Sequence, residues 1–96
     1  MFTHVVFFKL KDKSPENVNK AVQILKRVDG KVPTLKSVKV GADAVHSARS
    51  YDIALIAKFD SKEGMDEYQV HPVHVHEVLD NLKPMLESSA AVDFED

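Results

Sequence analysis

The segment YDIALIAKF, residues 51–59, is the clearest strand in the chain and decides the fold class. Side chains alternate between the two faces of a strand. Alternation here gives two apolar sets, with Tyr51, Ile53, Leu55 and Phe59 on one face and Ala54 and Ile56 on the other. A strand that is apolar on both faces must be covered on both faces. The segment therefore predicts a sheet that needs cover on two sides.

The N-terminal segment, residues 2–11, has the same two-faced character. Val5 and Phe7 fall on one face of this strand, while the other face carries Val6, Phe8 and Leu10. Two more strands are predicted from alternation at 34–42 and 88–95. In the last strand, Ala90, Val92 and Phe94 alternate with Ser89, Ala91, Asp93 and Glu95.

A helix is predicted between the first two strands. Ser14 suits the N-cap, Pro15 suits the first helical position, and apolar residues then recur at helical spacing as far as Val28. Gly30 is expected to end this helix in a left-handed conformation.

A second helical region is predicted between the third and fourth strands. Ser61 is expected to cap a short helix that carries Met65 and Tyr68. Pro72 should interrupt it, because a residue that precedes proline avoids helical torsion angles. Apolar residues resume at helical spacing from Val75 to Leu86, and Lys83-Pro84 is expected to kink or end this stretch.

The resulting order, β-α-β-β-α-β, predicts one α+β domain, residues 1–96, of the ferredoxin-like type. Two helices would cover one face of a four-stranded antiparallel sheet. The other face would carry either Val5 and Phe7 or Ala54 and Ile56, an apolar area that soluble monomers rarely expose. We therefore expect a homodimer, in which sheets from two chains face each other or close into a barrel.

Composition limits the function classes. The 96 residues are 44% hydrophobic with a net charge of -2 and dispersed lysines, so no broad basic surface for nucleic acid is expected. The chain has no cysteine, no apolar run long enough to cross a bilayer and no recognisable leader. We expect a cytoplasmic protein that binds neither nucleic acid nor membrane.

Several blocks of the sequence resemble the stress-responsive A/B-barrel domain (Dabb) family. These blocks are residues 4–11 (HVVFFKLK), 51–55 with 59–61, 68–75 (YQVHPVHV) and 92–95, so the resemblance covers nearly the whole chain. The resemblance implies a dimeric α/β barrel. Many members have no assigned reaction, one plant member is a polyketide cyclase, and the wider superfamily includes monooxygenases and haem-degrading enzymes.

Three residues are candidates for acid–base chemistry: His4, Tyr68 and His74. Imidazole can act as a base near neutral pH, and a tyrosine hydroxyl can bind a carbonyl oxygen as charge develops on it. The resemblance matches all three to pocket residues of the cyclase. The cyclase's second pocket tyrosine has no counterpart, since this chain offers only Leu25 or Lys26 there.

Structural roles compete with these assignments. His4 and Tyr68 also suit core positions, and His71 before Pro72 suits a helix cap. Val6, Phe8 and His71 are predicted to line a ligand pocket between sheet and helices.

Other cofactor and metal chemistry finds little support. His71, His74 and His76 are spaced i, i+3 and i+5, which does not converge on one helical stripe, so no metal site is expected. Neither a G-x-G-x-x-G nor a Walker-type loop occurs, and no cofactor is expected.

The sequence leaves three functions open. The first is a dimeric stress-type barrel of undetermined activity that binds a small apolar molecule. The second is a cyclase-like enzyme that performs acid–base chemistry on a carbonyl compound with His4, Tyr68 and His74. The third, a weaker alternative, is a cofactor-free monooxygenase.

Overall fold

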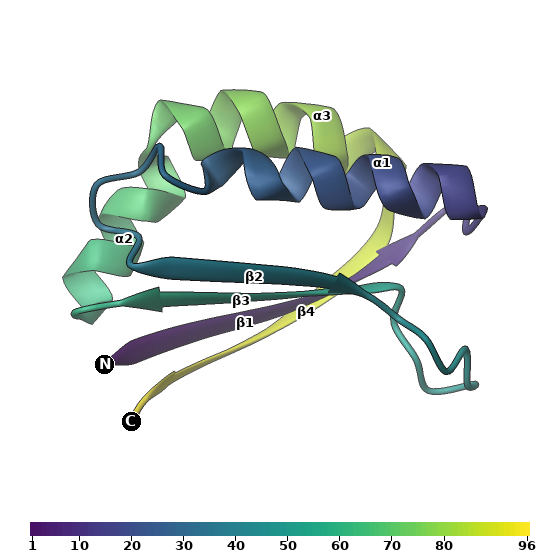
Figure 1. Cartoon of the computed structure of the whole chain (residues 1–96), viewed down its shortest axis with the longest axis horizontal. Coiled ribbons are helices and arrows are strands. Elements are labelled where there is room, and N and C mark those ends of the chain that lie inside the picture. The colour runs from purple at the N-terminus through teal and green to yellow at the C-terminus, as the bar shows by residue number, and fades with distance from the viewer.

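Four strands form one antiparallel sheet in the computed structural model, which describes all residues 1–96 (Figure 1). The elements are, in order, β1 (Phe2–Leu10), α1 (Pro15–Leu25), η1 (Lys26–Val28), β2 (Ser37–Ala42), β3 (Ile53–Phe59), α2 (Lys62–Val70), η2 (Val73–Leu79), α3 (Asp80–Leu82), η3 (Lys83–Met85) and β4 (Leu86–Glu95). The strand order is β2-β3-β1-β4. The predicted ferredoxin-like α+β fold is confirmed.

Local signals place the helix ends as expected. The Ser14 hydroxyl accepts a hydrogen bond from the Asn17 amide, and the Ser61 hydroxyl accepts one from the Gly64 amide, each at 3.3 Å. Each cap satisfies an amide that the first turn leaves free. Gly30 has a φ of 75°, which confirms the predicted left-handed conformation after η1.

The second helical region is continuous from η2 through η3 after the predicted break at Pro72. η2 is π-helical, a form that is rare in proteins and that periodicity in the sequence did not indicate. The helix ends at the turn containing Pro84, as predicted, but Leu86 already belongs to β4 rather than to the helix.

The strand predicted at residues 51–59 is shorter in the structure, where β3 begins at Ile53. The carboxylate of Asp52 instead accepts a hydrogen bond from the Leu10 amide at 2.8 Å, so it caps the end of β1. Tyr51 precedes the strand, so strand alternation does not determine which face its ring lies on. Its ring packs against Phe7 at 6.0 Å, on the face opposite Ile53, and the prediction that it shares a face with Ile53 is wrong.

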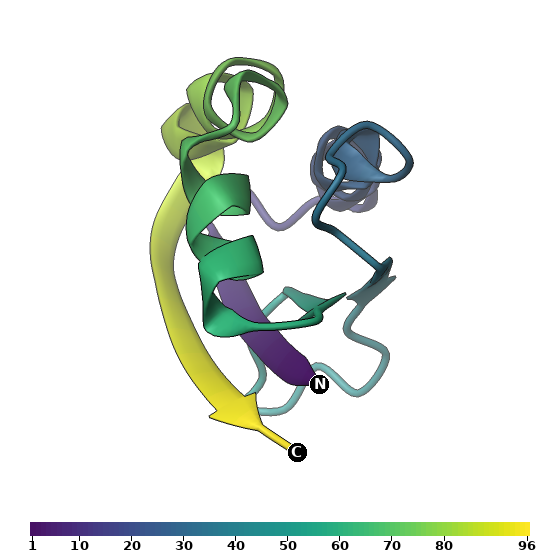
Figure 2. The same cartoon turned by 90° about the vertical axis from the view of Figure 1, so that its left-hand side faces the viewer.

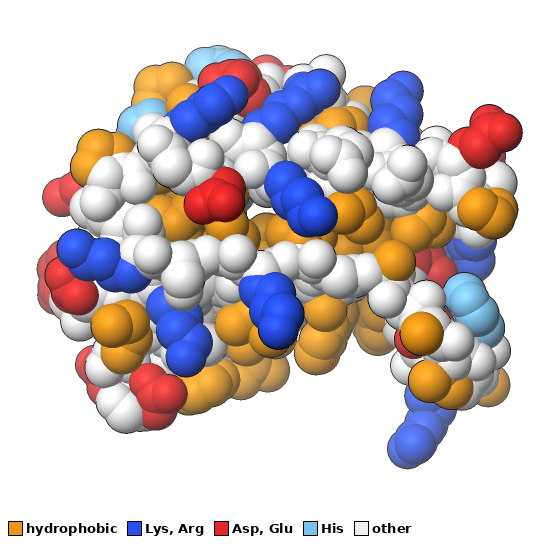
Figure 3. Space-filling view, viewed as in Figure 1, with side chains coloured by type: hydrophobic (Ala, Val, Ile, Leu, Met, Phe, Trp, Pro, Cys, Tyr) orange, Lys and Arg blue, Asp and Glu red, His pale blue; other side chains and the backbone are white.

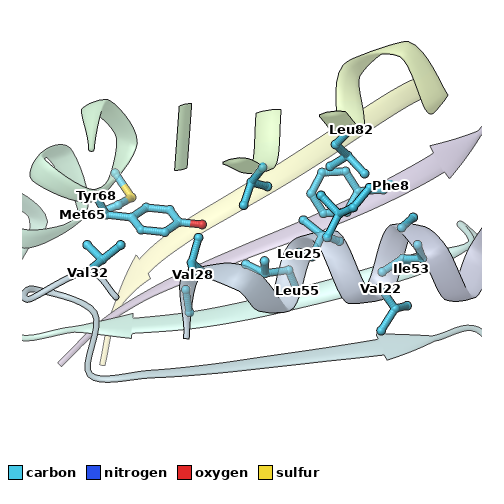
Figure 4. Close-up of a cluster of buried hydrophobic side chains, with 14 of the residues drawn as sticks. Phe8, Val22, Leu25, Val28, Val32, Ile53, Leu55, Met65, Tyr68 and Leu82 are labelled. Atoms are coloured by element: carbon cyan, nitrogen blue, oxygen red, sulfur yellow. The ribbon is translucent and has the colours of Figure 1, made fainter. Parts of the chain in front are cut away.

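The hydrophobic core lies between the sheet and the helices, which all cover the same face (Figure 2). Figure 4 shows this cluster, with Phe8 and Leu82 at one end and Tyr68 with Met65 at the other. Inward-facing residues of β1 and β3 alternate with residues of the open face, as the two-faced pattern requires.

The second face of the sheet has no helix over it. Phe7, Ile56, Val92 and Phe94 are 38–59% exposed on this open face. The strand register brings Val5 opposite both Ile56 and Val92, so the apolar surface is continuous across three strands. Apolar side chains are visible along the underside of the sheet in Figure 3. The predicted bare face, with Val5, Phe7, Ala54 and Ile56, is confirmed.

None of the helices combines the length and the apolar character needed to cross a membrane.

Candidate functional site

His4 lies on the helix-facing side of β1, where strand alternation places it. Its Cα partner on β4 is Asp93, and the His4 Nδ1 forms a very short hydrogen bond with the Asp93 Oδ1. Because a carboxylate accepts hydrogen bonds, Nδ1 carries the proton and Nε2 is left to face other groups. The His4 side chain is 9% exposed and that of Asp93 is 36% exposed. The pair thus fixes the orientation of an almost buried imidazole.

Tyr68 lies in the last part of α2 and brings the predicted residues together. Its ring is 2% exposed and packs against Phe59 with centroids 5.3 Å apart. The His74 ring lies at 4.3 Å from it and the His4 ring at 6.3 Å in an edge orientation. Residues from β1, α2 and η2 therefore form one cluster, which we call the His4–Tyr68–His74 cluster.

His74 is positioned by η2 and by the end of α2. Its Nδ1 donates a hydrogen bond to the Gln69 carbonyl oxygen at 3.1 Å, so its Nε2 is the free nitrogen. Burial lowers the pKa of His74, and the positive charge of Lys83 adds to this effect, while the Gln69 bond opposes it. The neutral imidazole is thus favoured, and it can accept a proton at Nε2.

The cluster contains three polar atoms without a partner in the chain: the Tyr68 hydroxyl and the Nε2 atoms of His4 and His74. Thr3 Oγ1, on the opposite face, is the only side-chain polar atom that is both unpaired and fully sealed. The three cluster atoms therefore keep a narrow contact with solvent. Burial raises the pKa of Tyr68 to about 12, so its hydroxyl stays protonated and can donate a hydrogen bond.

None of the other predicted site residues is hydrogen-bonded to these free atoms. His71 caps the next helix, since its Nδ1 accepts a hydrogen bond from the Val73 amide at 3.1 Å. Val6 is half-buried on the same face as His4. Phe8 lies four residues along β1 from His4, about 13 Å away at the rise of a strand, in the far part of the core.

Two hollows of the molecule lie away from the cluster. One, of about 380 Å³, lies at the open face and is lined by residues that include Phe7, Tyr51 and Ala54. The other, of about 270 Å³, lies beside the loop at residues 43–52 and has mostly polar walls. Neither hollow is the predicted pocket between sheet and helices, so that pocket and the roles of its predicted lining residues stay predictions.

Asp93 is a site residue that sequence reasoning missed. The alternation of residues 88–95 already placed it on the face opposite Val92 and Phe94. The signal that was lacking is the register of β1 against β4, which joins residues 89 positions apart. The structure brings no three His, Cys, Asp or Glu side chains together as metal ligands.

Comparison with known proteins places the fold in a family. Residues 2–96 match the model of the stress responsive A/B barrel domain. A stress-response A/B barrel domain-containing protein of Arabidopsis thaliana is 26% identical over 94 residues, which are 95% of this chain but 35% of the plant protein. The chain thus spans about a third of the length of this curated relative.

Solved structures agree with this placement. A dimeric ferredoxin-like protein of unknown function from Thermobifida fusca is 32% identical with a TM-score of 0.85, over 99% of this chain and 90% of its own. A dimeric protein of unknown function from Bacteroides fragilis, also ferredoxin-like, is 28% identical with a TM-score of 0.83, over 99% of this chain and 95% of its own. On the match over residues 2–96, this chain belongs to the stress responsive A/B barrel domain family.

Proposed function

We propose that this chain binds a small apolar molecule with one carbonyl group at the His4–Tyr68–His74 cluster and transfers a proton there. The single observation that carries this proposal is the packing of the Tyr68 ring against two histidine rings, each with one nitrogen free of any partner in the chain, in an otherwise apolar core. Imidazole and phenol groups packed together in apolar surroundings are suited to proton transfer.

The cluster suits proton transfer next to a carbonyl. The Tyr68 hydroxyl would donate a hydrogen bond to the carbonyl oxygen. Nε2 of His74 would take a proton from the adjacent carbon. The electron pair of that C–H bond would form a carbon–carbon double bond while the π pair of the carbonyl moves to the oxygen, where the Tyr68 hydroxyl stabilises the enolate. His74 would return that proton to carbon at the end of the exchange, and Asp93 would hold the imidazole of His4 in place, where its free Nε2 would accept a hydrogen bond from the ligand.

Supporting this role, His74 is neutral in its buried position and its ring is within contact of Tyr68. The chain has Leu25 or Lys26 where the cyclase resemblance expects a second tyrosine, so proton transfer does not imply ring closure.

The homodimer is the second part of the proposal. The open face exposes Phe7, Ile56, Val92 and Phe94, and a second copy of the same face would bury them. The related proteins from Thermobifida fusca and Bacteroides fragilis are described as dimeric, which supports the same assembly here. We also propose the cytoplasm as its compartment, because the chain lacks cysteine.

Proton exchange tests the catalytic part directly. A panel of small ketones and β-dicarbonyl compounds is incubated in D₂O, and loss of the signal of the proton beside the carbonyl is followed by NMR. The wild type and His76→Ala should accelerate exchange of at least one compound, and His74→Ala should not. His76 is a matched control, since it is exposed and lies two residues from His74.

The same samples separate binding from turnover. Saturable ligand contacts in NMR without faster exchange would reduce the function to binding. If neither binding nor exchange depended on His74 for any compound, the proposed site would be rejected.

A further inference from the structure

A hollow of about 380 Å³ lies between the sheet and the loop that joins β2 to β3, residues 43–52. This loop projects beyond the sheet in Figure 1, and Figure 3 shows it standing off from the apolar underside. Small-molecule sites commonly have volumes of about 300–1,000 Å³, so the hollow is large enough for a ligand. Its lining includes Phe7, Gly41 and Ala54 from the sheet and Asp43, Arg49 and Tyr51 from the loop.

The floor of the hollow is apolar and open. Gly41 on β2 pairs with Ala54 on β3, and a Cβ at Gly41 would meet nothing within 4 Å. At one side, the rings of Phe7 and Tyr51 pack with their centroids 6.0 Å apart. The Lys9 ammonium lies 4.9 Å from the centre of the Tyr51 ring, a cation–π contact that holds this ring in place. The floor therefore suits an apolar group.

Hydrogen bonds hold the loop in position over the hollow. At its base, the Asp43 amide donates to the Asp52 carbonyl oxygen at 2.9 Å, and the Asp52 amide donates to the Phe8 carbonyl oxygen at 2.8 Å. At its tip, the Ser50 amide donates to the Ser47 carbonyl oxygen at 3.1 Å, and the two serine hydroxyls lie 2.9 Å apart. The hollow is therefore formed before a ligand arrives, which lowers the entropic cost of binding.

Arg49 supplies free hydrogen-bond donors to this hollow. It lies inside the turn between Ser47 and Ser50, and its guanidinium makes no ion pair within the chain. The carboxylate in the lining, that of Asp43, is turned to the loop: its Oδ2 accepts a hydrogen bond from the His46 amide at 2.6 Å and lies 3.5 Å from the His46 Nδ1. A guanidinium with free donors is well matched to a carboxylate, which it can bind through two parallel hydrogen bonds.

We propose that this hollow binds a small carboxylate with an apolar body. Arg49 would donate hydrogen bonds to both carboxylate oxygens. The rings of Phe7 and Tyr51 would cover the apolar part, for which Gly41 and Ala54 leave room.

This site is independent of the function proposed above and goes beyond it. The His4–Tyr68–His74 cluster lies on the helix side of the sheet, whereas the hollow lies at the open face. A second copy can pack on the centre of the open face without displacing the ligand, because Val5, Ile56 and Val92 do not line the hollow.

Titration followed by NMR tests the site with two probes that share an aromatic body and differ in charge. In the ¹⁵N-labelled wild type, phenylacetate should shift the amide signals of residues 41–43 and 49–54 in a saturable manner. Phenylacetamide should bind about tenfold more weakly, because hydrogen bonds between two charged groups are the stronger ones. Arg49→Gln should bind both probes with the same low affinity.

Two further variants separate the hollow from its surroundings. Gly41→Leu places a side chain in the hollow at a residue without a positive φ. It should abolish the phenylacetate shifts while the circular dichroism spectrum and the sedimenting mass stay those of the wild type. Lys20→Gln removes a cation from the exposed surface of α1, on the helix side of the sheet, and should bind phenylacetate as the wild type does.

The same titrations can overturn the proposal. Equal affinity of Arg49→Gln and the wild type for phenylacetate would show that Arg49 does not hold the carboxylate. Saturable shifts around His74 instead of the 43–52 loop would place the probe in the cluster, and a wild type that phenylacetate does not shift at all would have no such site. Each of these three results would reject the carboxylate site and leave the proton-transfer proposal standing.

Discussion

Removal of the Tyr68 hydroxyl should stabilise the protein while impairing its site. The Tyr68 ring is 2% exposed, and its hydroxyl has no hydrogen-bond partner in the chain. An unpaired buried hydroxyl costs about 1–3 kcal/mol in mutational data. Since this hydroxyl keeps a narrow contact with solvent, we take the lower end of that range. Tyr68→Phe should therefore raise the free energy of unfolding by about 1 kcal/mol.

The packing around the ring should survive this change. Phenylalanine retains the ring contacts to Phe59 and His74, whose centroids lie 5.3 and 4.3 Å away. A gain of about 1 kcal/mol corresponds to a rise in Tm of about 4–8 °C for a domain of this size. At the same time, proton exchange on the best compound of the panel should fall, because the donor to the carbonyl oxygen is lost.

Urea and thermal unfolding followed by circular dichroism measure the stability. Both proteins must be compared at one concentration, because association contributes to the stability of a dimer. Tyr51→Phe is the matched control. Its ring lies on the other face against Phe7, so it should change stability by less than about 0.5 kcal/mol and leave exchange unchanged. If Tyr68→Phe lowered stability by about 1 kcal/mol, the hydroxyl would be a structural donor and this reasoning would be refuted.

Three further changes have defined outcomes. Burial lowers the pKa of His74, so the unfolded chain binds more protons than the folded chain between the folded-state pKa and about pH 6.5. The free energy of unfolding should therefore rise with pH over this range and then level off. In urea titrations at several pH values, His74→Gln should flatten this rise. Asp93→Asn should cost about 1 kcal/mol by weakening the hydrogen bond to His4, and should slow proton exchange; unchanged exchange would show that His4 needs no positioning. Gly30→Ala should cost about 1 kcal/mol in chemical unfolding, because an alanine is strained at a φ of 75° even though its Cβ would meet nothing within 4 Å.

Local features of the fold could be predicted because their causes are local. A serine three residues before an amide that needs a partner defines a cap, as at Ser14 and Ser61. Gly30 could be predicted to follow the helix because glycine adopts a φ of 75° more readily than other residues. The open face followed from strand alternation alone, since a period of two fixes which side chains share a face.

Features that depend on distant partners were harder to predict. Tyr51 continues the apolar pattern of β3, but the strand begins at Ile53 and the Tyr51 ring packs against Phe7 on the open face. Asp93 has an unambiguous face but gains its role only from the register that sets it beside His4. The π-helical form of η2 depends on which carbonyl each amide selects, and residue spacing does not encode that choice.

The candidate site was only partly predictable, because residue type can be read from the sequence but the partner of each residue cannot. His4, Tyr68 and His74 were selected from residue type and resemblance, and the structure brings their rings together. Their chemical roles stay predictions. His71 was assigned to a ligand pocket, but its ring nitrogen accepts a bond from the backbone of the following helix.

Sedimentation equilibrium at micromolar concentration tests the central claim, that the uncovered face of the sheet is buried by a second copy. The wild type should sediment as two chains, and Ile56→Lys should sediment as one chain with an unchanged circular dichroism spectrum, because Ile56 is 38% exposed at the centre of that face. A wild type that remained a single chain across this range would contradict the account.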